Sequence, residues 1–287
     1  MPRLPTPSPT VRKRRLAAEL RRLREQANMT GQAAAKELGW QHSKLTRIEK
    51  ADQGVRLDDL EQLMDLYSVH DGSLRDGLLQ LARDAKQRGW WADYRDVFSP
   101  GALPDFEAEA STIRCFEAQV VPGLFQTPRY IEAIFRGGAA HAPEVIQRHV
   151  QARLERQRII EGVHPAKVDA VIDEGALRRL VGGPDVMSEQ LQHLLNLAPR
   201  PNIDIRVLPF SAGAHAAVLG SFIILEFEDP LDPALAFTEG VGTRLIVEEA
   251  HQLDRYTEVY GHLLGAALRP DPSIEFIQKL MEETVQT

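Results

Sequence analysis

The stretch GQAAAKELGWQHSKLTRIEK, residues 31–50, fits the helix-turn-helix pattern position by position. The pattern needs a small residue where its two helices cross, and Ala35 stands at that position. Four residues later the turn needs a residue that tolerates a positive φ angle, and Gly39 stands there. The positions that would face the interior are all apolar: Ala34, Leu38, Trp40, Leu45 and Ile48. The stretch therefore predicts two short helices joined by a tight turn, with the second helix at about 41–50.

The second predicted helix has a polar outer side, formed by Gln41, His42, Ser43, Lys44, Thr46, Arg47 and Lys50. A helical hairpin whose polar side only meets water would show the same feature. The charge distribution favours DNA binding instead. Residues 1–50 contain 12 Lys and Arg and 4 Asp and Glu, a net charge of +8, whereas residues 51–287 carry −15. A basic segment on an acidic chain is typical of a domain that meets a polyanion, so we expect double-stranded DNA as a partner.

The surrounding sequence predicts five short helices within residues 14–87, two before this second helix and two after it. With the stretch SKLTRIE at 43–49, this arrangement resembles the Cro/repressor-like domain of regulators of the xenobiotic-response-element type. The resemblance implies that base-reading residues lie at His42, Ser43 and Arg47, with Gln41 and Lys44 flanking them. The planar guanidinium of Arg47 can donate two hydrogen bonds to guanine. Ser43 could instead cap its own helix.

The start of the preceding helix departs from the family pattern. We expect Thr30 to be the N-cap residue. Many relatives carry a glutamine directly after this cap, whereas here Gly31 follows and Gln32 comes one step later. We expect phosphate contacts from the basic residues around the motif and from this helix start: Arg14, Arg15, Arg21, Arg24, Thr30, Gln32 and Lys50.

Residues 1–13 contain prolines at positions 2, 5, 7 and 9 and several basic residues. This composition predicts a flexible basic arm. The arm could enter a minor groove, lie along phosphates or stay disordered.

The composition and pattern of the sequence change after residue 88. Residues 89–105 contain several Pro and Gly residues and predict a connector. Residues 106–287 alternate strand-like runs at 166–172, 203–208, 221–227 and 243–247 with helical patterns at 128–136, 143–161, 174–181, 185–197 and 251–268. We therefore expect an all-α five-helix DNA-binding domain at 14–88, followed by a mixed α+β domain at 106–287.

No residue pattern in the chain indicates catalysis or a cofactor. Cys115 is the single cysteine, His251 lacks the second histidine of a zinc-protease helix, and Gly240-x-Gly242 lacks the third glycine of a phosphate loop. We therefore expect no enzymatic activity, no cofactor and no metal site. The apolar run 222–225 is far too short to cross a membrane. We expect a cytoplasmic, nucleoid-associated protein.

Several segments of the C-terminal domain resemble the WhiJ-like transcription factors of actinobacteria. These segments are VPGLFQTPRY at 121–130, EGALRR at 174–179, RVLP at 206–209, GAH at 213–215 and GSF at 220–222. The resemblance implies an antitoxin-like regulator paired with a small protein encoded nearby. The loops at 121–130 and 211–221 could line a pocket or groove, or could simply be tight turns.

Together these features predict a sequence-specific repressor that binds its operator as a homodimer and is controlled by a small partner protein. A repressor that senses a small-molecule effector is the main alternative. An enzyme with an accessory DNA-binding domain is the third.

Overall fold

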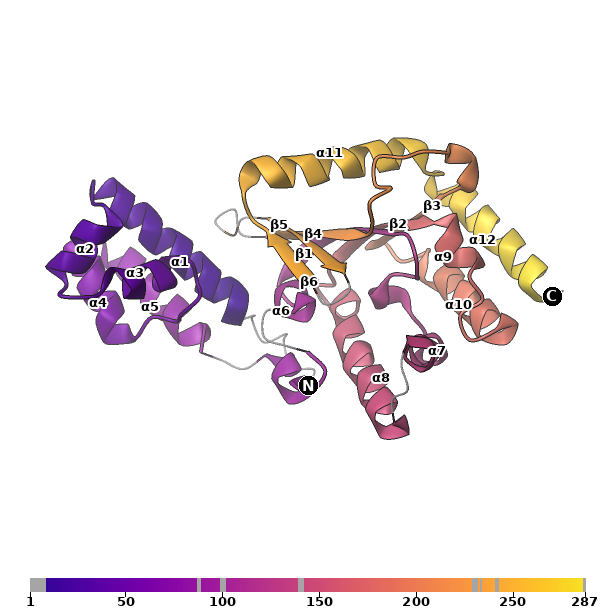
Figure 1. The fold of residues 1–287 in the computed structure, drawn as a ribbon, viewed down its shortest axis with the longest axis horizontal. Helices are drawn as coiled ribbons and strands as arrows, with labels where there is room; N and C mark the ends of the chain where they lie inside the picture. Colours follow the sequence, from indigo (N-terminus) through magenta and orange to yellow (C-terminus); the bar gives the residue numbers. More distant parts are fainter. Residues whose placement is uncertain are drawn as a thin grey trace. The chain divides into compact units, whose positions relative to one another are not determined.

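The computed structural model describes residues 9–86, 89–98, 102–138, 142–228, 232, 234–240 and 243–285. The chain forms two compact units (Figure 1). The first unit contains residues 1–109 and 229–232, and the second contains 110–228 and 233–287.

The first unit is all helical. Its helices are α1 (Pro9–Gln26), α2 (Gly31–Glu37), α3 (His42–Glu49), α4 (Leu57–Leu66), α5 (Gly72–Asp84) and α6 (Leu103–Glu107). One buried cluster holds the first five helices together, because each contributes its apolar side to it; the members below 2% exposure include Leu20, Ala34, Leu45, Leu60 and Leu63. The five predicted helices are thus confirmed.

Two details of the first unit differ from the prediction. Residues 9–13 are not part of a flexible arm, because α1 begins at Pro9, where proline is compatible with a first helical turn. Residues 1–8 lie outside the described residues. Residues 89–105 are more structured than a connector, since they contain a short 3-10 helix at Trp90–Tyr94 and the start of α6.

The second unit is built on one six-stranded mixed sheet with the order β3-β2-β1-β4-β5-β6. Its strands are β1 (Ala110–Glu117), β2 (Lys167–Asp173), β3 (Ile203–Leu208), β4 (Phe222–Phe227), β5 (Leu235–Gly240) and β6 (Thr243–Val247). Strands β1, β2 and β3 run parallel, while β4, β5 and β6 add antiparallel pairs beside β1. The predicted mixed α+β domain is confirmed, but β1 and β5 were not predicted.

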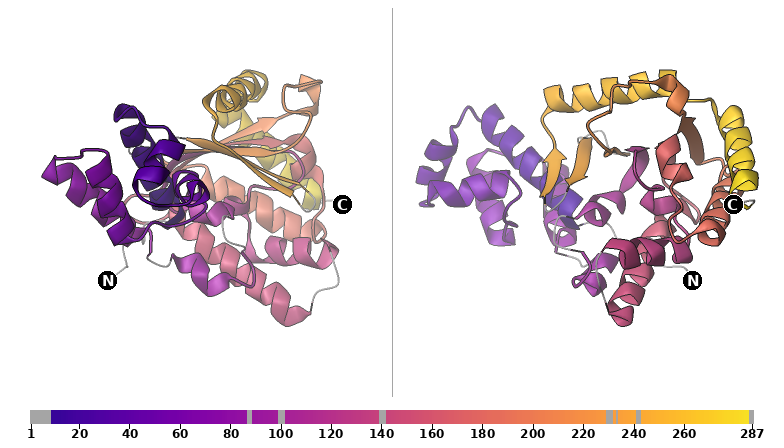
Figure 2. Two further views of the ribbon diagram at one scale, coloured as in Figure 1. Left: turned by 60° about the vertical axis from the view of Figure 1, so that its left-hand side comes forward. Right: turned by 45° about the vertical axis from the view of Figure 1, so that its right-hand side comes forward.

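Helices cover both faces of this sheet. These are α7 (Pro128–Gly138), α8 (Pro143–Gln157), α9 (Glu174–Arg178), α10 (Pro184–Leu197), α11 (Ala250–Ala266) and α12 (Pro270–Val285). The left view of Figure 2 shows the sheet nearly edge-on, with α11 on one side and α8 on the other. Tyr260 and Leu263 of α11 pack on Phe116 and Val171 of the sheet. None of the described helices is long and apolar enough to cross a membrane.

The segment between α11 and α12, together with the first turn of α12, covers the edge strand β3. The Val207 N–H donates to Ser273 Oγ at 3.0 Å, and the Leu268 N–H donates to the Val207 carbonyl at 2.8 Å. These bonds satisfy backbone groups that an open edge would leave available for pairing with another chain.

Candidate DNA-binding surface

The turn between α2 and α3 has the predicted geometry. Gly39 adopts a φ of +67°, and its N–H donates to the Lys36 carbonyl at 3.1 Å. The Trp40 N–H then donates to the Ala35 carbonyl at 2.8 Å. A Cβ atom at Gly39 would meet no atom within 4 Å. The glycine is therefore required for its backbone angle and not for space.

Replacing Gly39 with valine should misplace α3, because a β-branched residue resists a positive φ angle. We expect Gly39→Val to lower the free energy of unfolding of the first unit by about 1–3 kcal/mol and to weaken DNA binding. Gly39→Asn is the matched control, because asparagine tolerates this conformation. Urea denaturation and DNA titration would measure both effects. Full stability and binding in the valine variant would contradict the role of the turn.

The inner side of α3 is anchored in the core. Leu45 and Ile48 are 1% and 2% exposed, next to the buried Ala34 and Ala35. The backbone of Gln41 occupies the N-cap position of α3. Ser43 therefore lies inside the helix and does not cap it. Its side chain is exposed.

The outer side of α3 is exposed at the positions expected to face DNA. Gln41, His42, Ser43, Arg47 and Lys50 are all exposed. These residues form what we call the α3 surface. No ion pair within the described part of the chain holds Arg47. The α3 surface is thus accessible to a duplex.

The position of His42 explains why a glycine stands at position 31, where many relatives carry a glutamine. A Cβ atom at Gly31 would lie 3.2 Å from His42 Nε2, so the glycine leaves room for the imidazole beside the start of α2. Thr30 is the N-cap of α2, as predicted, because its Oγ1 accepts a hydrogen bond from the Ala33 N–H at 3.1 Å. Thr30 and Gln32 are both exposed. The His42 side chain at the start of α3 therefore lies beside the start of α2, near the predicted phosphate contacts Thr30 and Gln32.

Lys44, which we expected to flank the base contacts, has partners within its own unit. Its ammonium pairs with Asp59 Oδ1 at 2.8 Å and lies 3.6 Å from the centre of the Trp40 ring. Both contacts hold the half-buried side chain against its own unit. Lys44 thus connects α3 to α4.

Arg24, which we expected to contact a phosphate, has partners within its own unit. Its guanidinium donates two hydrogen bonds to the Glu49 carboxylate, at 2.7 and 3.0 Å, and a third to the Met29 carbonyl at 2.7 Å. Both charged side chains are only 11% exposed. The bond to Glu49 raises the pKa of Arg24, with burial opposing it. We call this pair the Arg24–Glu49 clamp, because it ties α1 to the end of α3.

The other three arginines of α1 that we expected to contact phosphates divide into two groups. Arg21 is 65% exposed and pairs with Glu25 on the same helix at 3.0 Å. Arg14 lies 5.3 Å from the centre of the Phe106 ring, and Arg15 lies 3.7 Å from Asp232. Ten residues of helix, about 15 Å, separate Arg14 from the clamp at Arg24. The structure therefore does not bring Arg14 and Arg15 to the α3 surface.

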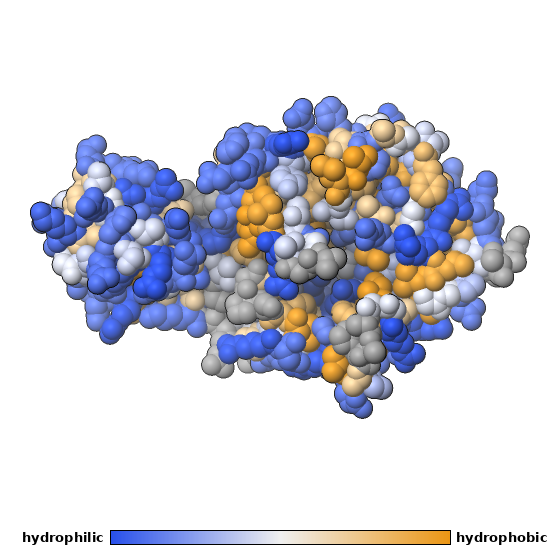
Figure 3. Space-filling view, viewed as in Figure 1, coloured by the Kyte–Doolittle hydropathy of each residue, from blue (hydrophilic) through white to orange (hydrophobic). Residues whose placement is uncertain are grey.

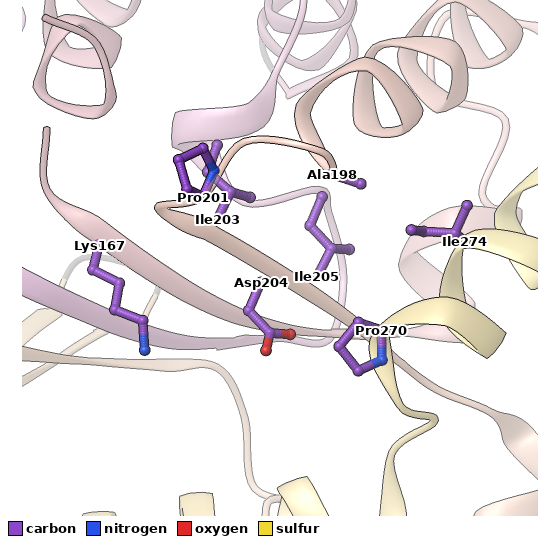
Figure 4. A pocket seen from close by; sticks show the side chains of 8 residues that line it. All are labelled: Lys167, Ala198, Pro201, Ile203, Asp204, Ile205, Pro270 and Ile274. Atoms are coloured by element: carbon purple, nitrogen blue, oxygen red, sulfur yellow. The ribbon is translucent and has the colours of Figure 1, made fainter.

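The second unit contains a cavity of about 190 Å³ beside the start of β2 and β3 (Figure 4). Its charged residues are Lys167 and Asp204, and the other lining residues are Ala198, Pro201, Ile203, Ile205, Pro270 and Ile274. Lys167 pairs with Asp169 at 3.1 Å and Asp204 pairs with Arg206 at 3.1 Å. Cys115 is buried, and the described residues contain no group of His, Cys, Asp and Glu that could hold a metal ion.

Comparison with protein families agrees with the division into two units. A family described as a domain of unknown function, DUF5753, matches residues 101–279, which is more than half of the chain. The chain belongs to the DUF5753 family. A helix-turn-helix domain family matches residues 15–78 of this DUF5753 chain. Comparison with curated proteins and with solved structures found no match. The exposed α3 surface and the matching helix-turn-helix family together identify a DNA-binding regulator.

Proposed function

We propose that this chain is a sequence-specific transcriptional repressor that places α3 in the major groove of its operator. The observation that carries the proposal is the α3 surface, where five polar side chains lie exposed on a helix whose other side is buried. Arg47 would read guanine, and His42 and Ser43 would contact neighbouring base edges. Lys50, Arg21, Thr30 and Gln32 would contact phosphates and fix the register on the duplex.

The repressor would act as a homodimer that blocks a promoter. Dimers of this motif place two recognition helices about 34 Å apart, one helical turn of DNA. Each half-site would then present the same bases to Arg47 of one protomer.

The C-terminal domain could control the repressor in two ways. Control by a small protein encoded nearby is supported by the resemblance to WhiJ-like regulators. The net charge of −10 on residues 106–287 is a further support, since it would attract a basic partner. Exposed apolar side chains add a second support: Phe210, Val218 and Leu219 are 60%, 64% and 97% exposed. On the face shown in Figure 3, apolar side chains gather on the second unit and hydrophilic ones cover most of the first. Control by a small molecule is the other candidate. We propose no enzymatic activity.

The purified full chain should select a single DNA motif from sheared genomic DNA. We expect the enriched fragments to share two inverted half-sites whose centres are about one helical turn apart. Sequencing of the bound fragments would show this motif. Failure to bind any duplex at low salt, or enrichment of fragments without a common motif, would contradict the proposal.

Arg21→Ala should weaken binding to all DNA sequences about equally. Because Arg21 would contact a phosphate, its loss should reduce the slope of log affinity against log salt concentration by about one. Titrations of operator and unrelated DNA at several salt concentrations would measure this. Arg158→Ala in the second unit is the matched control, since Arg158 is also exposed and pairs with a glutamate three residues before it. An altered base preference with an unchanged salt slope would contradict the assignment.

A further inference from the structure

The two edges of the six-stranded sheet end differently. At the β3 edge, the segment before α12 and the first turn of that helix satisfy the backbone groups of Val207. At the opposite edge, β6 pairs with β5 along residues 243–247 and is the last strand in the sheet order. Within the described residues, no strand pairs with the outer side of β6. Because an edge strand points N–H and C=O groups outward, β6 presents these groups to another strand.

The residues of β6 do not protect this edge. Edge strands that stay unpaired are usually protected by proline, by charged side chains or by a covering element. The strand reads TRLIV and contains no proline, and Leu245 at its centre is 55% exposed. Val247, on the same face, belongs to the buried cluster beneath α11. Arg244, the one charged residue of the strand, pairs with Glu239 of β5 at 3.1 Å. An added strand would therefore extend an apolar face that Leu245 already begins.

The sequence of β6 is complementary to itself in one antiparallel register. When Ile246 stands opposite Ile246 of a second copy, Arg244 stands opposite Glu248, the exposed residue that directly follows β6. Leu245 then stands opposite Val247. Opposite charges and apolar side chains thus face each other across the strands, and twofold symmetry repeats each pair. A register centred on Leu245 would instead place Arg244 opposite Ile246.

We propose that β6 pairs with β6 of a second copy of this chain in this antiparallel register. The two six-stranded sheets then form one continuous sheet across the twofold axis of the homodimer. Backbone hydrogen bonds contribute to the affinity, and the pairs between Arg244 and Glu248 of the second copy fix the register. A strand of five residues makes a small interface, so we expect the free dimer to be in equilibrium with the monomer. The proposal rests on the homodimer of the proposed function and names the surface that forms it.

Cross-linking at position 246 tests the register directly. Residues directly opposite each other have Cβ atoms about 4.5–5.5 Å apart, close to the separation in a disulfide. Cys115, the single native cysteine, is buried, so an added surface thiol reacts first. We expect mild oxidation of Ile246→Cys to give at least about tenfold more covalent dimer than the same treatment of Val163→Cys. Val163 is the matched control because it is 85% exposed and lies in the loop before β2. Non-reducing gel electrophoresis would measure both.

Exchange of the two charges tests the pairs between copies, with association measured by sedimentation velocity. Arg244→Glu and Glu248→Arg should each weaken dimerisation by about tenfold or more, because opposite charges become like charges in both symmetric pairs. The double variant restores opposite charges and should associate within about threefold of the wild type. The new carboxylate beside Glu239 remains in the double variant, so this recovery reports the contact between copies. Arg255→Glu, at an exposed position of α11, is the control and should change association by less than about twofold.

Equal cross-linking of Ile246→Cys and Val163→Cys would overturn the proposal, as would a double variant that associates no better than the single variants. If the wild type is dimeric in either case, the homodimer stands and another surface forms it. If the wild type is monomeric both free and on operator DNA, the homodimer falls together with this proposal. Sequence-specific DNA binding is measured separately, by the selection of genomic fragments, and does not depend on these outcomes.

Discussion

Replacing Arg24 with methionine should lower the free energy of unfolding of the first unit by about 3 kcal/mol, the lower end of the range for breaking a buried ion pair. Arg24 supplies two hydrogen bonds to Glu49 and one to the Met29 carbonyl. Its loss leaves the Glu49 carboxylate nearly buried beside Tyr67. Burial also raises the pKa of the Tyr67 hydroxyl. Because the clamp ties α1 to the end of α3, the variant should also bind operator DNA more weakly.

Tryptophan fluorescence during urea denaturation would measure this effect. The three tryptophans, Trp40, Trp90 and Trp91, all belong to the first unit and report on its unfolding alone. Arg21→Met is the matched control, because it removes an exposed arginine from the same helix. Replacing both clamp residues by apolar ones should restore part of the stability, since no uncompensated charge remains. A loss below about 0.5 kcal/mol in Arg24→Met would show that the clamp does not stabilise the unit.

Replacing Arg47 with alanine should cost about 1–3 kcal/mol of operator affinity, roughly 5- to 150-fold, and relax the preference at one base position. Arg47 is exposed on α3 between the buried Leu45 and Ile48, so its side chain can reach a base edge without rearrangement. Stability should change little, since the residue has no ion pair within the described residues.

Competition between the operator and its single-base variants would locate the affected position. Lys50→Ala serves as the comparison, because loss of a phosphate contact should weaken operator and variant sites alike. If Arg47→Ala kept the full base preference of the wild type, Arg47 would not be a base-reading residue.

The DNA-binding motif could be predicted from sequence because its determinants are local. The glycine of the turn, the cap at Thr30 and the apolar positions of α3 all lie within about 20 consecutive residues. The clamp could not be predicted in this way, since Arg24 and Glu49 lie 25 residues apart and no periodic pattern connects them. The ion pair of Lys44 could not be predicted for the same reason, because its partner Asp59 lies on the next helix.

The second unit was harder to predict. Strand β1 contains Arg114 and Glu117 among its apolar residues and gives no clear alternation, yet it pairs with strands on both sides. The contacts of α8 with the loop at 121–127 were also invisible in the sequence, where Arg153 and Arg156 belong to an ordinary basic helix. Only the tertiary fold brings this loop to them. The segments that carried the family resemblance were conspicuous, but their purpose depends on contacts between distant residues.

Asp232 belongs to the first unit although it lies far along the chain, and it approaches Arg15 at 3.7 Å. A protein truncated after residue 109 would lose this carboxylate and gain one net positive charge next to a helix that already carries several arginines. Such a truncated protein should adhere more strongly to any duplex and discriminate less between duplexes. The selectivity measured on the truncated protein would therefore underestimate the selectivity of the intact regulator.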